Sequence, residues 1–334
     1  MAPTTNPPAR PQQALPELFT PIRAELAEVE QLLQRELHSE WPFVDELVRY
    51  GWLLGGKRLR PALLLLAGKA TGTLCPDHTV LAAVVEMIHT ATLVHDDVLD
   101  EAELRRHLAT VNSRWDTDTS VLLGDYLFTH AFYLASTLES TYACRTIGRA
   151  TNTVCEGELR QVHGRGDFAM TEEQYLSIIQ AKTAELCACC CHLGAHAAGA
   201  DPATVQRLGQ YGRWLGIAFQ ISDDLLDLVG DESTMGKSLG TDLQKRKPTL
   251  PLIHVFQQCS GRERAALESL LTAPLAEQRE ALPWWFERFG ALEYGRAKAE
   301  QYGQRARQSL EGLAPNLARD VLAELPSFVV TRTR

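Results

Sequence analysis

Apolar side chains recur along most of this chain at the three- and four-residue spacing that places them on one face of a helix. From Ile22 onward they fall on Leu26, Val29, Leu33 and Leu37. Further stripes at this spacing are Val80, Val84, Met87 and Ala91; Leu122, Tyr126, Thr129 and Tyr133; Ile178, Ala181 and Glu185; and Leu215, Ala218 and Ile221. No convincing run alternates between apolar and polar residues, as a half-buried strand would. The pattern predicts an all-α protein.

Glycine and proline residues separate the predicted helices. Breaks are expected at Gly55-Gly56, from Gly72 to Pro76, from Gly164 to Asp167, from Gly199 to Pro202, from Gly230 to Pro251, and at Pro274. We expect roughly ten to thirteen helices in a single bundle, because no segment reads as a linker. Residues 1–16 contain five prolines and no acidic residue. A disordered tail is expected there, followed by one domain over residues 17–334.

The overall charge narrows the range of partners. The chain of 334 residues is 45% hydrophobic and 22% charged, which is typical of a globular protein. Its formal net charge of −9 argues against nucleic-acid binding, which needs a basic contact face. Anionic small molecules remain suitable ligands, because a few placed cations can reverse the local field. No apolar run is long enough to span a bilayer, so membrane contact is expected to be peripheral at most.

Half of the eight cysteines crowd into about one helical turn, at positions 187, 189, 190 and 191. They are too close together to form a disulfide framework, and the N-terminus has no signal-peptide pattern. We therefore expect reduced thiols and a cytoplasmic protein. Zinc binding by these thiols with His192 and His196 is an alternative. Because no second Cys-x-x-Cys pair matches the first, small buried core residues are the favoured interpretation.

Two short aspartate strings are near copies of each other. Both read DDxxD within apolar helical stretches: Asp96-Asp97-Val98-Leu99-Asp100 and Asp223-Asp224-Leu225-Leu226-Asp227. The first and last aspartates of each string share a helix face, where like charges repel and require a compensating cation. Magnesium that keeps some ligand positions for a phosphate-bearing substrate fits this requirement best. The alternative is two solvated acidic turns.

Three cationic clusters accompany the aspartates. They are Lys57, Arg58 and Arg60 after a glycine turn; Arg105 and Arg106 after the first string; and Lys237, Lys245, Arg246 and Lys247 after the second. Arg58, Lys245 and Arg246 fit a solvated surface as well as a site. The others suggest a diphosphate site, where arginine is bidentate and lysine a point charge. Gly236-Lys237-Ser238 is not a P-loop, because Asp231 replaces the required glycine and no strand precedes it.

Taken in order, these motifs resemble the trans-polyprenyl diphosphate synthases, strongly over roughly residues 50–255. The motifs are Gly-Gly-Lys-x-x-Arg at 55–60, DDxxD with Arg105-Arg106, Gly-Glu-x-x-Gln at 157–161, Lys182-Thr183, Gln220 before the second DDxxD, and Gly236-Lys237 followed by Lys-Pro-Thr-Leu-Pro at 247–251. The resemblance implies an isoprenoid synthase fold, with helices around a central cavity. It also implies magnesium-assisted condensation of isopentenyl diphosphate with an allylic diphosphate, in a homodimer.

The resemblance also implies individual roles. About three magnesium ions would be held by Asp96, Asp100 and Asp223, with Asp97, Asp224 and Asp227 in support. The allylic diphosphate would contact Arg105, Lys182, Lys237 and Lys247, with Thr183 and Gln220 beside the developing cation. Isopentenyl diphosphate would contact Lys57, Arg60, His89 and Arg106. His89 taken alone is more typical of a packed core histidine, but its place seven residues before Asp96 puts it on the same helix face.

Two positions depart from the family pattern. Where the family usually has Arg-Arg-Gly, this chain has Arg105-Arg106-His107. Where it usually has Glu-Gly-Lys before the Thr-Leu-Pro segment, this chain has Lys245-Arg246-Lys247. Replacing glycine at either place can alter the loops that close over the diphosphates. We expect the activity to survive.

Product length is expected to depend on residues just before the first string. Family members with a bulky aromatic there stop elongation early, whereas this chain has the small residues Ala91 and Thr92. Phe128 or Phe132 could form a floor deeper in the cavity. We therefore expect a product of about six to ten isoprene units, with geranylgeranyl or farnesyl diphosphate synthesis as the alternative. A non-catalytic subunit would usually lack the aspartates, and a terpene cyclase would not need the Lys57 and Arg60 site.

Overall fold

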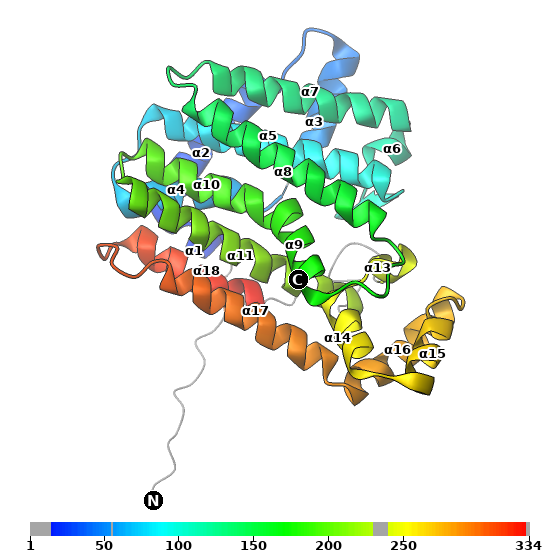
Figure 1. Ribbon diagram of the computed structural model, residues 1–334. Coiled ribbons are helices and arrows are strands. Elements are labelled where there is room, and N and C mark those ends of the chain that lie inside the picture. Colours follow the sequence, from blue (N-terminus) through cyan, green and yellow to red (C-terminus); the bar gives the residue numbers. More distant parts are fainter. Residues whose placement is uncertain (1–14, 55, 230–239, 332–334) are drawn as a thin grey trace, which may run out of the picture.

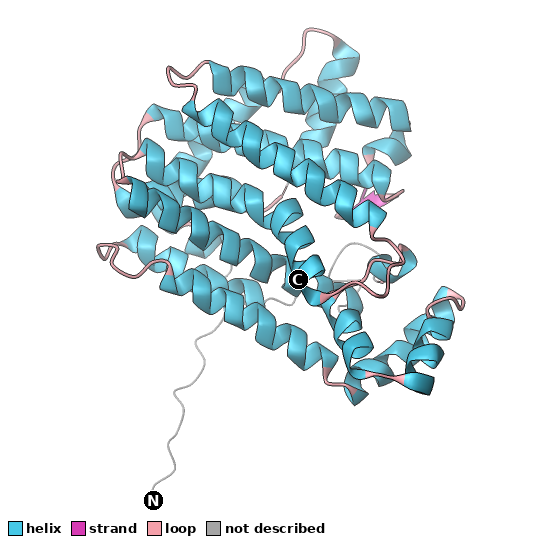
Figure 2. Cartoon of the chain, viewed as in Figure 1, coloured by secondary structure: helices cyan, strands magenta, loops and turns pink. Residues whose placement is uncertain are grey.

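The computed structural model describes residues 15–54, 56–229 and 240–331. These residues form a bundle of helices, which confirms the all-α class (Figures 1 and 2). The strands within these ranges are β1 (Leu104–Arg105) and β2 (Leu108–Ala109), which pair as a short antiparallel hairpin. No helix among the described residues is long and apolar enough to cross a membrane.

The helices follow one another with short connections. In chain order the helices are α1 (Leu15–Leu18), η1 (Thr20–Ile22), α2 (Arg23–Glu36), α3 (Pro42–Leu53), α4 (Leu59–Thr71), α5 (Pro76–Leu99), α6 (Val111–Arg114), α7 (Thr117–Ser136), α8 (Tyr142–His163), α9 (Glu172–Ile179), η2 (Gln180–Ala184), α10 (Glu185–Ala197), α11 (Pro202–Val229), α13 (Thr241–Gln244), α14 (Leu250–Gln258), α15 (Gly261–Leu270), α16 (Leu275–Arg288), α17 (Ala291–Gln308) and α18 (Leu317–Thr331). Helix α1 begins within the expected N-terminal tail, of which residues 1–14 lie outside the described ranges.

The main core surrounds α4, which packs against α5, α10 and α18. Leu63, Leu64, Leu65 and Leu66 are all fully buried. Four consecutive leucines point in all directions around a helix, so α4 must be covered on every side. A second apolar cluster joins α14, α15 and α16, at the lower right of Figure 1, around Phe256 and neighbouring residues. The cysteines of α10 are free thiols buried in the main core.

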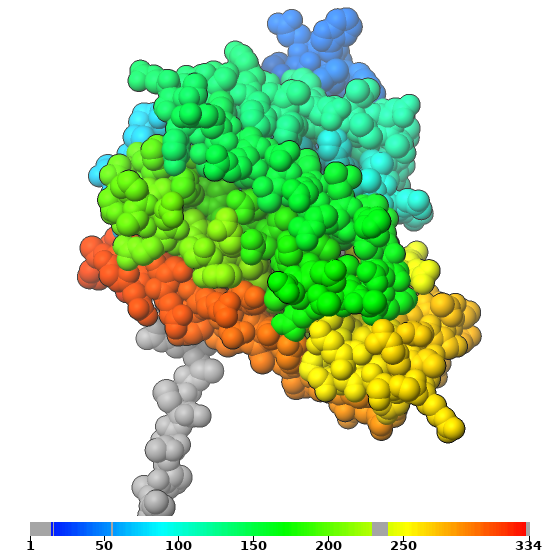
Figure 3. Space-filling view, in the orientation of Figure 1, coloured from blue at the N-terminus to red at the C-terminus, as the bar shows by residue number. Residues whose placement is uncertain are grey.

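One predicted stripe does not face the core. The stripes on α2, α5 and α11 are largely buried as expected. On α7, however, the side chain of Leu122 is 66% exposed and that of Tyr133 is 64% exposed. Periodicity indicates that one helix face is apolar, but it does not say what covers that face. Leu122 and Tyr133 therefore lie on the surface of the described chain, and α7 itself runs along the upper part of the molecule in Figures 1 and 3.

A turn of π-helix, η2, joins α9 to α10. Such turns insert an extra residue into the helix and often occur at functional sites. Helix α8 packs closely against this turn at Gly157. A Cβ atom on Gly157 would lie only 2.6 Å from the backbone nitrogen of Lys182. The sequence stripe at 178–185 did not predict this turn. Its consequence is that Lys182 and Thr183 are presented by an irregular turn held against α8.

Candidate active site

The two aspartate strings occupy the ends of two long helices. The first lies in the last turn of α5, with Asp100 as its C-terminal cap residue. The second lies in the last turns of α11, where Asp223 is half-buried and Asp224 and Asp227 are buried. Both helix ends therefore present carboxylates at the same end of the bundle, where the loops after them supply basic side chains.

Asp97 of the first string is held by the hairpin that follows it. The Arg105 guanidinium donates from Nε to both carboxylate oxygens at 3.0 and 2.9 Å and from Nη2 to Oδ1 at 2.8 Å. Burial raises the pKa of Asp97, although Arg105 opposes the shift. Fork-shaped contacts of this kind fix both partners in position. Arg105 is thus placed beside the string by an ion pair with its most buried member.

Asp96 and Asp100 are surrounded by lysines from separate parts of the chain. Lys182 Nζ lies 3.8 Å from Asp96 and 2.7 Å from Glu158 of α8. Burial raises the pKa of Asp96 to about 6, against the field of Lys182. Lys245 and Lys247 lie 2.9 and 3.5 Å from Asp100. Burial alone would raise the pKa of Asp100, but these two lysines outweigh it and lower the pKa.

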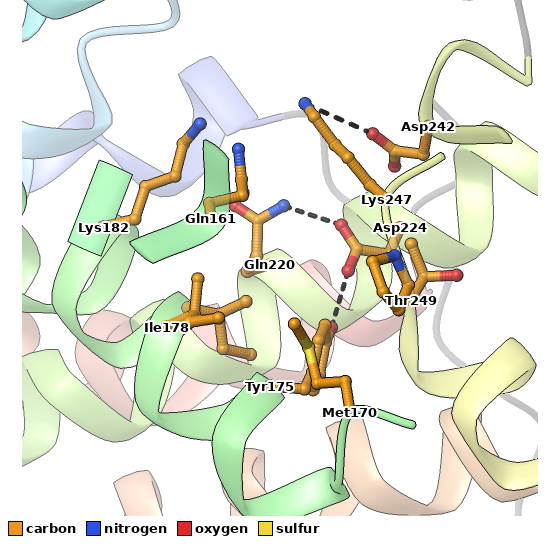
Figure 4. Close-up of a pocket in the computed structure, with 12 residues that line it drawn as sticks. Gln161, Met170, Tyr175, Ile178, Lys182, Gln220, Asp224, Asp242, Lys247 and Thr249 are labelled. Atoms are coloured by element: carbon orange, nitrogen blue, oxygen red, sulfur yellow. Dashed lines mark hydrogen bonds and ion pairs between the residues drawn. The ribbon is translucent and has the colours of Figure 1, made fainter. Parts of the chain in front are cut away.

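The second string is tied to α9 and η2 by hydrogen bonds. Tyr175 donates its hydroxyl to Asp224 Oδ2 at 2.6 Å, and Gln220 donates to Oδ1 at 2.7 Å (Figure 4). The Gln220 amide oxygen in turn accepts from the Thr183 hydroxyl at 2.8 Å. Burial raises the pKa of Asp224 to about 7. Asp227 accepts from the Thr241 hydroxyl at 3.0 Å and from a backbone N–H at 3.1 Å, which anchors the start of α13.

A cavity lies between these groups. It is lined by Gln161, Met170, Tyr175, Ile178, Ile179, Lys182, Gln220, Asp224, Asp242, Lys247, Pro248 and Thr249 (Figure 4). Lys182 and Lys247 also contact the first string, so both aspartate strings border one site. Lys182, Gln161 and Lys247 lie on one side of the cavity, and Ile178 and Met170 lie on another (Figure 4). An anionic ligand with an apolar tail would match this division.

The carboxylates fit a metal that is shared with a ligand. Among the described residues, no three His, Cys, Asp or Glu side chains form an all-protein metal cage. Magnesium characteristically binds through one or two carboxylates together with waters and substrate phosphates. Asp96 and Asp100 on one helix end and Asp223 on the other meet that description. The donor set therefore suits magnesium only together with a phosphate-bearing ligand.

A second cationic group lies behind the first string. A Cβ atom on Gly56 would lie 2.8 Å from the Arg106 guanidinium, which shows how closely the Lys57 loop and the hairpin approach. Burial, assisted by Arg60 and nearby arginines, lowers the pKa of His89 well below its usual value. His89 is therefore a neutral imidazole in this cluster, able to donate one hydrogen bond. The predicted isopentenyl diphosphate residues do share one region, with Lys57 exposed at its edge.

Arg58 and Lys245, which the sequence could not assign to the surface or to the site, both form ion pairs with other side chains. Arg58 donates to Glu30 and, at 2.9 Å, to the buried Glu86, and its guanidinium lies 3.7 Å from the centre of the Trp52 ring. Lys245 contacts the first string, as described above. Lys237 lies outside the described residues.

Several site residues had no assigned role in the sequence interpretation. Glu158 was visible in the Gly-Glu-x-x-Gln motif, but nothing in the sequence indicated that it pairs with Lys182. Asp242 lies 3.6 Å from Lys247, and no spacing rule connects this pair to either string. Tyr175 was hidden because an aromatic residue within a helix stripe is usually a core residue. These contacts arise from folding and not from sequence proximity.

Both departures from the family pattern fall on left-handed backbone. Arg106 and His107 have φ values of 52° and 65°, and they form the two-residue turn between β1 and β2. Arg246 has φ of 54°. Glycine adopts this conformation without steric cost, whereas residues with a Cβ atom do not. The chain therefore keeps the turn geometry that glycine would favour while carrying basic or imidazole side chains there.

The predicted chain-length residues lie on α5 and α7. Ala91 is 1% exposed, and the Thr92 hydroxyl donates to the carbonyl of His89 on its own helix. Phe128 and Phe132 are half-buried, with ring centres 5.2 Å apart. Ala91, Phe128 and Phe132 therefore offer apolar side chains, and the Thr92 hydroxyl is already hydrogen-bonded within its own helix.

Comparison with known proteins places the chain in a family. The Polyprenyl synthetase family model matches residues 42–287. Octaprenyl diphosphate synthase of Escherichia coli (strain K12) is 36% identical over 318 residues, covering 93% of this chain and 96% of that protein. A crystal structure of polyprenyl synthase from Caulobacter crescentus CB15, complexed with calcium and isoprenyl diphosphate, has a TM-score of 0.91 at 36% identity and covers 98% of this chain and 100% of its own. A decaprenyl diphosphate synthase from Rhodobacter capsulatus has a TM-score of 0.90 at 37% identity, covering 96% and 100%. These matches confirm the resemblance: the chain belongs to the polyprenyl synthetase family of trans-polyprenyl diphosphate synthases and is a prenyltransferase.

Proposed function

We propose that this chain uses magnesium to condense isopentenyl diphosphate with an allylic diphosphate in the cavity between α9, η2 and α11, next to the end of α5. The observation that carries the proposal is the position of two lysines. Lys182 and Lys247 line the cavity beside Asp224, and each also contacts the first aspartate string. An allylic diphosphate placed there would meet carboxylates through metal and lysines directly.

The roles of the side chains follow from the charge that must be stabilised. When bound by Asp96, Asp100 and Asp223, magnesium supplies Lewis-acid stabilisation of the departing diphosphate. Lys182, Lys247 and Arg105 add preorganised positive charge at the same position. Thr183 and Gln220 hold a fixed pair of dipoles beside the cavity. The apolar cavity wall excludes water from the allylic cation.

Support for the metal comes from the donor set and from a relative. The Caulobacter crescentus protein was crystallised with calcium and isoprenyl diphosphate, and calcium also prefers oxygen ligands. We carry over from the family resemblance a count of about three magnesium ions per site. The second cationic group, with Lys57, Arg60, His89 and Arg106, would bind isopentenyl diphosphate.

The product would be about six to ten isoprene units long, because the small residues Ala91 and Thr92 leave room for the tail just below the first string. His95 Nε2 lies 3.1 Å from the carbonyl oxygen of Val121, which aligns the site end of α5 with the start of α7. Ala91 then lies about 6 Å below His95 along α5, close to the site, and Phe132 lies further from the site along α7. The small residues Ala91 and Thr92 therefore lie nearer the aspartate strings, and the aromatic residue Phe132 lies further from them.

Sizing of the products tests both activity and length. Purified protein with farnesyl diphosphate, isopentenyl diphosphate and magnesium should give products longer than geranylgeranyl diphosphate. Ala91→Phe should shorten the products, and Phe132→Ala should lengthen them. A wild-type product of three units or fewer would contradict the small-residue argument. Unchanged product lengths in both variants would show that neither residue borders the tail.

The exposed α7 stripe supports a homodimer. Leu122 and Tyr133 lie on one face of α7, with Val121 39% exposed beside them. Helix α8 contacts α7 and adds Leu159, whose side chain is 72% exposed. Exposed apolar residues gathered on neighbouring helices mark interaction surfaces. The eight free thiols favour a reducing compartment, so we place the enzyme in the cytoplasm.

A further inference from the structure

The loop between α8 and α9 brings an arginine to the first aspartate string. Arg165 Nη2 lies 3.3 Å from Asp100 Oδ1 and 3.5 Å from the backbone oxygen of Leu99. We propose that Arg165 is an additional cation of the allylic diphosphate site, held in place by the loop that carries Arg246. The inference rests on the proposed function, because it assigns Arg165 to that substrate.

Contacts between the two loops fix the position of Arg165. The backbone N–H of Gly166 donates to the carbonyl of Arg246 at 2.8 Å. Gly166 has φ of 78°, and a Cβ atom there would lie 3.4 Å from the Arg246 guanidinium carbon. That guanidinium lies 5.5 Å from the centre of the Phe168 ring, two residues further along the loop. Arg246 therefore holds the loop through its backbone and its side chain.

The charge around Asp100 is suited to a polyanion. Lys245, Lys247 and Arg165 lie 2.9, 3.5 and 3.3 Å from this single carboxylate. Of these three, Lys247 has a second carboxylate partner, Asp242, at 3.6 Å. A diphosphate bound beside Asp100 would lie close to all three cations and could accept several charge-assisted hydrogen bonds from them.

The Arg165 guanidinium keeps a donor for such a ligand. Its Nε is buried and has no hydrogen-bond partner within the described part of the chain. A buried N–H without an acceptor is unfavourable, so the contacts with Asp100 and Leu99 do not fully satisfy the Arg165 guanidinium. The planar fork of arginine also matches phosphate oxygens better than an ammonium group does.

The test compares Arg165→Gln with Arg165→Lys in the full chain. Calorimetric titration with magnesium and inorganic pyrophosphate should give about ten-fold weaker binding for the glutamine variant and an intermediate value for lysine. In steady-state assays, the KM for farnesyl diphosphate should rise about as much while the KM for isopentenyl diphosphate changes less than two-fold. Arg160→Gln is the matched control, because Arg160 on α8 donates to Ser177 instead. It should bind pyrophosphate as the wild type does.

Three results would overturn the assignment. One is wild-type pyrophosphate affinity in Arg165→Gln, and another is an equal rise in both KM values. The third is a lower melting temperature and weaker binding that Arg165→Lys does not restore, which would indicate a structural role. The assignment and the proposed function fail separately. A wild type that binds pyrophosphate through Arg165 but forms no prenyl product would refute the condensation activity alone.

Discussion

His107 occupies a backbone conformation that favours glycine. Its φ of 65° lies in the second position of the hairpin turn, next to Arg106 at 52°. Left-handed backbone costs a residue with a Cβ atom roughly 1–2 kcal/mol, and the greater freedom of glycine in the unfolded chain offsets about 0.5–1 kcal/mol of that. His107→Gly should therefore raise the free energy of unfolding by about 0.5–1 kcal/mol.

Urea unfolding of two variants checks this prediction. Glu103→Gly is the matched control, because Glu103 is exposed, lies just before β1 and does not have a positive φ. Glu103→Gly should lower the urea concentration at which half of the protein is unfolded, since glycine there only adds freedom to the unfolded chain. If both variants lower the midpoint equally, the turn is not strained at His107.

Asp224 should make the stability of the protein depend on pH. Its pKa is raised to about 7 by burial, from a usual value of 3.8. The folded state therefore binds a proton more tightly than the unfolded state, and its stability falls as pH rises from about 4 through 7. Asp224→Asn removes the charge while the amide oxygen can still accept from Gln220. In magnesium-free buffer the variant should melt several degrees above wild type at pH 8.

At pH 5 this difference in melting temperature should be much smaller, because Asp224 is then already protonated in the folded wild type. A difference that stays constant between pH 5 and pH 8 would show that packing, and not the buried charge, separates the two proteins. Magnesium binding should also weaken in the wild type below about pH 6, where Asp96 becomes protonated.

At the scale of elements, the contact between α8 and the π-turn η2 should be sensitive to one methyl group. A Cβ atom on Gly157 would lie 2.6 Å from Lys182 N and 2.8 Å from Ala181 Cβ. Gly157→Ala should cost about 1–3 kcal/mol in stability. It should also lower kcat, because the displaced backbone carries Lys182 and Thr183.

Gly148→Ala on the same helix provides the control for this prediction. Its Cβ atom would meet only Phe132 Cε1, at 3.9 Å. With no clash, the better helix propensity of alanine should stabilise the protein by up to about 1 kcal/mol. Thermal melts and kcat measurements on the two variants would show opposite changes in stability. Equal kcat values in wild type and Gly157→Ala would mean that α8 does not position η2.

The elements also show how far sequence reasoning reaches. The long helices follow from apolar periodicity, and the stripe on α5 was correctly placed in the core. Short features were not predicted: η2 leaves the apolar period nearly intact, and the hairpin of β1 and β2 has only two residues in each strand. Both depend on tertiary packing, which one-dimensional patterns do not record.

The candidate site likewise contains residues that the sequence alone identifies and residues that only the fold brings to the site. Charged residues in repeated or family-like strings, such as Asp96 and Lys182, could be identified from the sequence alone. Tyr175 and Glu158 could not, because each meets its partner from a different helix. Arg165 lies in a glycine-flanked break whose position was predicted, but its pairing with Asp100 depends on how the loop folds back.

At the scale of the whole molecule, the exposed α7 stripe predicts the oligomeric state. Leu122 and Tyr133 are more than half exposed, although their spacing is that of a buried helix face. A stable interface needs roughly 800 Å² from each partner, which exceeds what one helix face provides. We therefore expect a pair of copies to cover the α7 stripe together with adjoining α8 residues.

A double variant, Leu122→Arg with Tyr133→Arg, should separate the copies without unfolding them, because both side chains lie on the surface. Sedimentation should give a species of 37.1 kDa for the variant and twice that mass for wild type. Trp284→Arg is the control, since Trp284 is 54% exposed on α16, outside the α7 and α8 face. It should remain dimeric.

A dimeric double variant would place the interface elsewhere, and a monomeric wild type would refute the homodimer. Within one copy, His95 of α5 bonds to Val121 of α7 and so links α7 to the helix that carries the first aspartate string. Loss of the partner's packing against α7 should therefore also lower kcat.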